Sequence, residues 1–168
     1  RVYDFVQTTP LVHAAGMSER LGAVVHLKRE DLNNAYTFYI RGAYARLAEL
    51  KAQGCTEVIT VSIGSRGYAI ACAAQRLGLS ATIVMPEQTP KSRSTAVARK
   101  GATVLRHGAT VSEAHAYAAR CADESTSGLH LLSAHDDPYI IAGNATVGIE
   151  ITRQHGAALS AALAGTCG

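Results

Sequence analysis

Short runs of apolar, often β-branched residues alternate along the chain with longer segments whose apolar positions recur every three or four residues. The first pattern is typical of strands buried in a parallel sheet, and the second is typical of amphipathic helices. Glycine or proline follows several of these segments, as is common where helices and strands end. The pattern predicts strands over residues 24–28, 58–62, 81–85, 103–105 and 129–132, and helices over 40–51, 67–77, 90–100, 111–122 and from 136–138 onwards.

The alternation between residues 58 and 132 predicts the fold class. Repeated strand–helix–strand units place successive strands parallel and pack the helices over the sheet. We therefore expect an α/β fold with an open parallel sheet and helices on both faces. No internal repeat or linker divides the chain, and the Ala-rich residues 157–168 fit a helix, a buried strand or a disordered tail equally well.

Composition and charge narrow the class of partner. The 168 residues are 48% hydrophobic and carry a net charge of +3, with no basic stripe of the kind that binds nucleic acid. No apolar run approaches the ~18 residues of a membrane-spanning helix, and no signal pattern precedes residue 10. We therefore expect no nucleic-acid or membrane partner and a cytoplasmic protein. The first residue, Arg1, and the abrupt end at Gly168 suggest a fragment or a trimmed chain.

Metal chemistry is not expected from the cysteines and histidines. The 4 Cys and 7 His residues are dispersed and form no CxxC or paired-histidine spacing of a zinc site. Cys72 and Cys121 lie in Ala-rich helical patterns and are interpreted as small buried residues.

The loop between the strand 58–62 and the helix 67–77 is the clearest candidate for a binding site. Its sequence SIGSRG lies where exposed backbone N–H groups and the helix dipole favour a carboxylate or a phosphate. It lacks the GxGxxG and GxxxxGK[ST] patterns, so a nucleotide is not predicted. The alternative is a tight turn whose two glycines are required by geometry alone. The candidate anion-binding residues are Ser62, Gly64, Ser65, Arg66 and Gly67.

Several further motifs are uninformative singly but indicate a protein family in combination. They are TTPL (8–11), LKREDL (27–32), TFYIRGAY (37–44), VMP (84–86), TPK (89–91), GA (101–102) and DDPYIIAGNATVGIEI (136–151). In this order and spacing they resemble the threonine dehydratase and serine racemase group of fold-type II pyridoxal-phosphate enzymes. The resemblance covers residues 8–151.

The resemblance implies a domain division and a cofactor position. Residues 51–132 would form the small parallel domain, and residues 1–50 and 133–168 a partial large domain, with pyridoxal phosphate in the cleft between them. By resemblance alone, the residues next to the cofactor would be Phe38, Ser65, Gly165 and Gly168.

The sequence departs from the family pattern at the positions that hold the cofactor. Tyr39 stands where the family has the lysine that binds pyridoxal phosphate covalently and moves the α-proton. Ser65 and Arg66 replace the Asn-His pair of the loop, and GTCG at 165–168 stands where a tetraglycine phosphate loop would begin. We therefore expect pyridoxal phosphate to be absent or bound noncovalently, and lyase chemistry to be impaired. The loop could still bind a small amino-acid-like or carboxylate ligand.

Three interpretations stay open. The chain is a non-catalytic relative with a binding or regulatory role, a working enzyme of altered chemistry, or a fragment whose missing part restores the site. In the second case Tyr39 acts as an acid or base beside a cation, either Arg41 or Arg66; otherwise its ring simply fills space left by the cofactor. A partial large domain exposes apolar surface, so we expect a homo-oligomer or a completing second chain.

Overall fold

The computed structural model describes residues 2–133 and 136–156. Its centre is a parallel sheet in the order β5–β4–β3–β6, formed by β3 (Glu57–Val61), β4 (Ser80–Met85), β5 (Thr103–Arg106) and β6 (His130–Leu131). The predicted α/β class and the parallel sheet are confirmed. Each predicted strand between 58 and 132 is present, with no end shifted by more than one residue.

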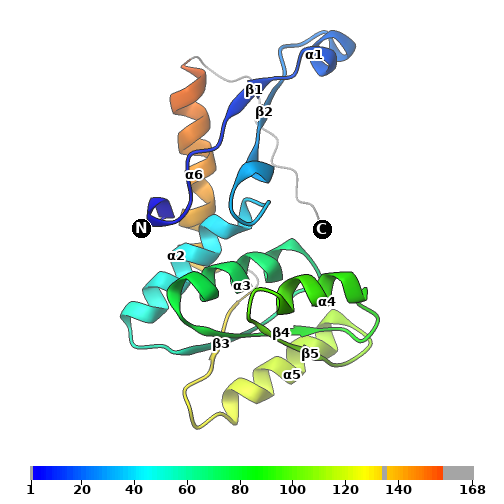
Figure 1. Cartoon of the computed structure of the whole chain (residues 1–168), viewed down its shortest axis with the longest axis vertical. Helices are drawn as coiled ribbons and strands as arrows, with labels where there is room; N and C mark the ends of the chain where they lie inside the picture. Colours follow the sequence, from blue (N-terminus) through cyan, green and yellow to red (C-terminus); the bar gives the residue numbers. More distant parts are fainter. Residues whose placement is uncertain (1, 134–135, 157–168) are drawn as a thin grey trace.

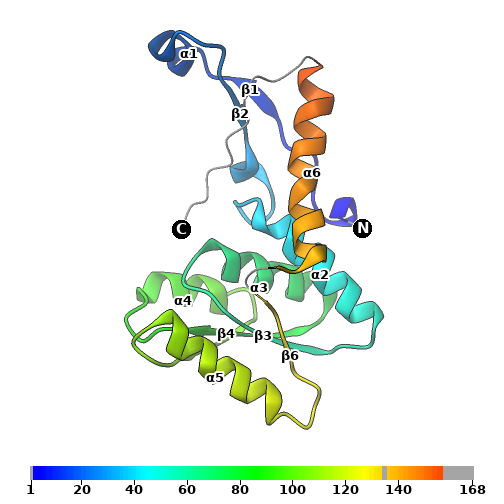
Figure 2. The same ribbon diagram turned by 180° about the vertical axis from the view of Figure 1, so that it is seen from behind.

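Helices cover both faces of this sheet, as expected. Figures 1 and 2 show α3 (Ser65–Leu77) and α4 (Lys91–Ala98) on one face and α5 (Val111–Asp123) on the other. Successive side chains of β4 point to opposite faces, so Ile83 packs in the core beside α3 while Val84 packs in the smaller core beneath α5. The β-branched strands thus fill two hydrophobic layers.

Two helices continue the structure away from the sheet. The helix α2 (Tyr39–Ala52) packs against α3 and also crosses α6 (Pro138–His155). The two helices approach closely because a glycine of each lies at the crossing. A Cβ at Gly42 would lie 2.6 Å from the Ile140 carbonyl oxygen, and one at Gly143 would lie 2.6 Å from the Arg41 carbonyl oxygen. The helix α6 begins where the sequence predicts, because the Asp137 side chain accepts hydrogen bonds from Tyr139 N and Ile140 N.

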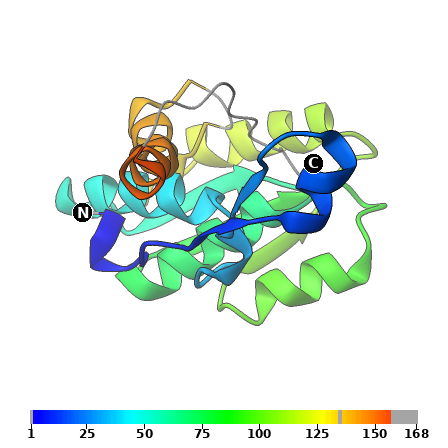
Figure 3. The ribbon, with the colours of Figure 1, turned by 90° about the horizontal axis from the view of Figure 1, so that it is seen from above.

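The N-terminal part contains the strand predicted over 24–28, which the structure places at His26–Lys28, together with elements that the hydrophobic pattern did not predict. A 3₁₀ turn at Val2–Asp4 is followed by β1 (Leu11–His13), α1 (Ala15–Leu21), β2 (His26–Lys28) and a second 3₁₀ turn at Glu30–Leu32. The strands β1 and β2 form an antiparallel pair beyond the main sheet, and Figure 3 shows the N-terminal segment passing beside α6 toward them. The helix α1 buries none of its residues, so no apolar periodicity marks it in the sequence.

Two other boundaries also differ from the prediction. The helix predicted from residue 67 begins at Ser65, directly after Gly64, and the helix predicted over 90–100 ends at Ala98 before the left-handed Gly101 (φ +82°). The division into a small domain at 51–132 and a partial large domain stays a prediction. Among the described residues, no helix combines the length and apolarity needed to cross a membrane.

Candidate functional site

The glycine loop joins the end of β3 to the start of α3 and is held by one hydroxyl group. Ser62 Oγ accepts hydrogen bonds from Gly67 N (2.9 Å) and Gly64 N (3.3 Å). A Cβ at Gly67 would lie 2.9 Å from Ser62 Cβ and 3.2 Å from Ile83 Cγ2, so the turn itself requires this glycine. The geometric interpretation of the loop therefore accounts for Gly67.

Gly64 has a different role from Gly67. Its φ of −147° is extended backbone that any residue adopts, and the atom nearest to a Cβ at this position would be Arg93 Nη1 at 3.9 Å. Neither backbone strain nor close packing demands a glycine there. The lack of a side chain leaves the first turn of α3 approachable, where helix amides lack intrahelical acceptors.

Arg66 lies beside this turn, at the carboxyl ends of two sheet strands. Its Nη2 donates to Thr60 Oγ1 (2.7 Å) and to the Ser133 carbonyl oxygen (3.3 Å), while its buried Nε has no hydrogen-bond partner among the described residues. Burial lowers the pKa of the Arg66 guanidinium, and its interaction with the Tyr39 phenol opposes that shift. Within the described ranges no carboxylate forms an ion pair with Arg66.

Tyr39 is the first residue of α2 and is half-buried. Its ring lies against that of Phe38, with ring centroids 4.3 Å apart, and packs against the main core. Of the two candidate cations, Arg66 interacts with the Tyr39 phenol, whereas Arg41 points away into a buried acidic cluster. Arg66, which belongs to the loop 62–67, is therefore the candidate cation within electrostatic range of Tyr39.

Arg41 joins a buried ionic cluster that the sequence analysis did not anticipate. Its fully buried guanidinium binds the Glu30 carboxylate (Nε to Oε2, 2.8 Å) and the Glu150 carboxylate (Nη1 to Oε1, 2.6 Å). Lys28 Nζ also lies 2.6 Å from Glu150 Oε2, and Thr9 Oγ1 donates to Glu30 Oε1 (2.5 Å). Four of the motifs behind the family resemblance, TTPL, LKREDL, TFYIRGAY and DDPYIIAGNATVGIEI, thus meet in one cluster.

The opposite charges of this cluster shift each other's pKa so that both charged forms are favoured. Burial alone would raise the pKa of Glu150, but hydrogen bonds from Arg41, Lys28 and Tyr3 lower it to about 2. Burial opposes the charge of Arg41 as well, yet hydrogen bonds to Glu30 and Glu150 raise its pKa. The sequence did contain one signal of this cluster. Arg41 and Glu150 are the only charged residues in the segments 37–44 and 138–151, and a charge that becomes buried needs a partner.

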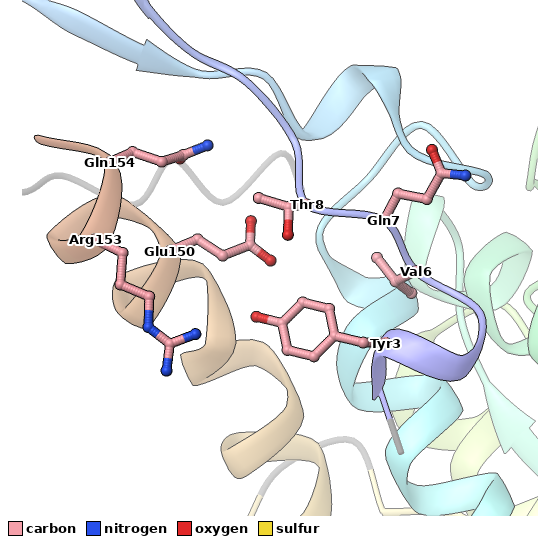
Figure 4. A pocket seen from close by; sticks show the side chains of 7 residues that line it. All are labelled: Tyr3, Val6, Gln7, Thr8, Glu150, Arg153 and Gln154. Atoms are coloured by element: carbon pink, nitrogen blue, oxygen red, sulfur yellow. The ribbon is translucent and has the colours of Figure 1, made fainter.

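An open pocket of about 490 Å³ lies beside this cluster, between the N-terminal segment and α6 (Figure 4). It is lined by Tyr3, Val6, Gln7, Thr8, Glu150, Arg153 and Gln154, and none of the loop residues 62–67 takes part. In the described ranges no group of three or more His, Cys, Asp or Glu side chains is placed to hold a metal ion.

The residues present do not fit covalent attachment of pyridoxal phosphate. The phenol of Tyr39 has no amine with which to form an imine. The four lysines have other positions: Lys28 lies in the ionic cluster, Lys51 donates to the Leu77 carbonyl, Lys91 is exposed at the start of α4, and Lys100 lies over the Tyr68 ring. The predicted phosphate-loop residues Gly165 and Gly168 lie outside the described residues.

Comparison with known proteins identifies the family. Residues 2–168 match the family described as pyridoxal-phosphate dependent enzyme. The chain belongs to this family. It is 44% identical over 154 residues to the mitochondrial threonine dehydratase of Schizosaccharomyces pombe and 46% identical over 155 residues to a chloroplastic biosynthetic threonine dehydratase of Solanum lycopersicum. These matches cover 91% and 92% of this chain but 25% of each relative.

Solved structures of the family have the same fold. Threonine deaminase isoform 2 from Solanum lycopersicum has a TM-score of 0.83 and 38% identity, and the match covers 91% of this chain and 42% of that one. Maize serine racemase has a TM-score of 0.84 and 28% identity, covering 92% and 46%. The resemblance to the threonine dehydratase and serine racemase group is thus confirmed, while this chain spans less than half of either solved structure.

Proposed function

We propose that this chain is a threonine dehydratase-like protein that binds the carboxylate of a small amino-acid-like ligand, and that position 39 provides no covalent anchor for pyridoxal phosphate. The observation that carries the proposal is Arg66: a partly buried guanidinium without a carboxylate partner among the described residues, in the first turn of α3 and within electrostatic range of Tyr39. Family membership supports an amino-acid ligand, because the relatives named above are threonine dehydratases.

Electrostatics favours an anion at this place. Burying a guanidinium costs free energy unless the charge is paired, and the strongest hydrogen bonds of a guanidinium are those to carboxylates. The two neighbouring neutral oxygens, Thr60 Oγ1 and the Ser133 carbonyl, satisfy only part of the donor set. A carboxylate would accept from the remaining guanidinium donors and from the amides at the start of α3.

Ammonia-lyase chemistry of the family type is not supported by position 39. A phenol, which titrates in water at about pH 10, cannot replace an amine as the covalent anchor and is poorly matched to proton abstraction near neutral pH. We therefore expect this chain to be impaired in that reaction by orders of magnitude. Pyridoxal phosphate, where it binds, is held noncovalently.

A second candidate function is favoured by how little of its relatives' length the chain covers. The matched segment is 25% of each of the two dehydratases named above, so the chain fits a piece of a larger threonine dehydratase-like enzyme. In that case the remaining part supplies the rest of the site. The cytoplasmic location also stays a prediction, because the two relatives are named mitochondrial and chloroplastic.

Calorimetric titration with L-threonine, L-serine and acetate tests the binding proposal. We expect all three to bind in competition, and Arg66→Gln to weaken binding by about tenfold or more, because it removes one charge-assisted hydrogen bond. Arg76→Gln is the matched control, since Arg76 lies in the last turn of the same helix beside the Phe5 ring. Equal binding by wild type and Arg66→Gln, or no binding by folded wild type, would overturn the proposal.

A further inference from the structure

A second guanidinium lies against the glycine loop. Arg93 belongs to α4, which packs beside α3 on the same face of the sheet (Figure 1). Its Nη1 donates to the Ile63 carbonyl oxygen (2.6 Å), and the same atom would lie 3.9 Å from a Cβ at Gly64. The Arg93 head group is therefore held at the place where Gly64 leaves the loop open.

Arg66 and Arg93 flank this loop. In the sheet order β5–β4–β3–β6, β6 lies on one side of β3 and β4 on the other. Arg66 reaches the β6 side, because it donates to the carbonyl oxygen of Ser133, which follows β6. Arg93 comes from α4, which connects β4 to β5 on the other side. A ligand bound at the first turn of α3 thus has a guanidinium on each side, at the carboxyl end of a strand where the sheet order reverses.

The positive charge around the loop is not matched by acidic side chains of the described ranges. Within them neither Arg66 nor Arg93 forms an ion pair, and neither does Lys91 in the first turn of α4. An amino acid such as serine brings one carboxylate and one ammonium group, so it adds no net negative charge. A ligand with a second acidic group supplies the negative charge that these cations attract.

We propose that the loop prefers an amino acid whose side chain ends in a second anionic group, a carboxylate or a phosphate, and that Arg93 binds this group while Arg66 binds the α-carboxylate. The inference rests on the carboxylate site proposed above and adds the class of side chain. Arg93 has donors to spare, because its Nε and Nη2 have no hydrogen-bond partner among the described residues. Arg93 is exposed, so water weakens the contact and we expect a preference of about fivefold.

Calorimetric titration with two pairs of amino acids measures this preference. L-aspartate and L-asparagine have nearly the same size and differ in the charge of the side chain, and O-phospho-L-serine and L-serine differ by the phosphate group. We expect the charged member of each pair to bind about fivefold more tightly than its neutral partner. The larger of the two ratios shows whether a carboxylate or a phosphate is preferred. Added sodium chloride should reduce both ratios, because salt screens an exposed ion pair.

Variants of Arg93 test its part in the preference. Arg93→Gln should bring the ratio between aspartate and asparagine close to one, and Arg93→Lys should retain a preference because it keeps the charge. Arg99→Gln is the matched control, since Arg99 is exposed at the other end of α4 and should leave the ratio unchanged. Arg93 also donates to the Ile63 carbonyl oxygen, so its loss can disturb the loop. Such a disturbance would weaken both ligands alike, and the ratio separates it from loss of the second contact.

The outcomes distinguish this inference from the proposed function on which it rests. If the wild type binds both members of each pair equally well, the second anionic group has no site, and carboxylate binding at the loop still stands. If Arg93→Gln keeps the full preference, the second group binds away from Arg93 and the inference is overturned. If the folded wild type binds none of the four amino acids, the carboxylate site itself is refuted together with this inference.

Discussion

Arg41 Nη1 lies 2.6 Å from Glu150 Oε1 although 109 residues separate them in the chain. Both side chains are buried, and the contact joins α2 to α6 at the point where Glu30 and Lys28 also arrive from the N-terminal segment. Such a cluster does not by itself add much stability, because desolvation offsets the attraction between the charges. Removal of one charge, however, leaves its buried partners unpaired, and the resulting loss of stability can be measured.

Removal of Arg41 should destabilise the chain strongly. Arg41→Met leaves the Glu30 and Glu150 carboxylates without their guanidinium partner, so we expect a loss of about 3–5 kcal/mol in the free energy of unfolding. Urea denaturation followed by circular dichroism measures this loss. Arg29→Met is the control, because the Arg29–Asp31 pair is exposed and such pairs contribute about 0–1 kcal/mol. Equal stability of the two variants would contradict a central role of the cluster.

Glu150 should make stability depend on pH in the acid range. Its pKa is lowered from 4.5 to about 2 in the folded chain, so the folded state favours the charged form. The stabilisation is fully present above pH 4.5 and is lost as the pH falls toward 2, because the unfolded chain takes up the proton first. Glu150→Gln should be less stable at neutral pH and should lose less additional stability between pH 4.5 and 2. Parallel slopes for the two proteins in urea denaturation across this range would show that other groups dominate.

Alanine substitutions at two glycines of α6 should have opposite effects on stability, because only one of them lies at the crossing with α2. A Cβ at Gly143 would lie 2.6 Å from the Arg41 carbonyl oxygen, whereas nothing lies within 4 Å of one at Gly148. We expect Gly143→Ala to cost about 1–3 kcal/mol through overpacking. Gly148→Ala should instead gain up to about 1 kcal/mol, because alanine favours the helix. Thermal denaturation of the two variants checks the difference in sign.

The sheet was predictable from the sequence because its strands are β-branched runs that fill two apolar layers, so their composition and their environment agree. The start of α6 was also predictable, since Asp137 and Pro138 form a helix start by local chemistry. The strand β1 was not, because it has three residues and is defined by its pairing with β2.

The candidate site was predictable only in part. The loop 62–67 is local, and its sequence shows the turn and the arginine. The choice between Arg41 and Arg66 as the neighbour of Tyr39 depends on contacts across the fold. Arg41 turns toward Glu30 and Glu150, which lie 11 and 109 residues away, and no periodicity in the sequence reveals that preference.

The substitution Tyr39→Lys should show whether the fold still surrounds a pocket for pyridoxal phosphate. Position 39 is half-buried, beside Phe38 and within electrostatic reach of Arg66, so a lysine there would sit beside a cation and lose water, and both effects lower an amine pKa and increase its reactivity. The measurement is a titration with pyridoxal phosphate followed by visible absorbance and by mass spectrometry after borohydride reduction. Tyr36→Lys is the control, because residue 36 is 72% exposed and offers an ordinary surface amine.

The three proteins separate the interpretations of Tyr39. We expect the wild type to remain unmodified at stoichiometric pyridoxal phosphate and Tyr39→Lys to gain one covalent addition at residue 39 that Tyr36→Lys lacks, since only a preorganised site concentrates the aldehyde at the amine. A specific addition to a wild-type lysine would show that another residue has taken over the anchoring role, contrary to our proposal. If Tyr39→Lys folds but stays unmodified, the space around residue 39 no longer admits the cofactor, and the Tyr39 ring then fills it as part of the core.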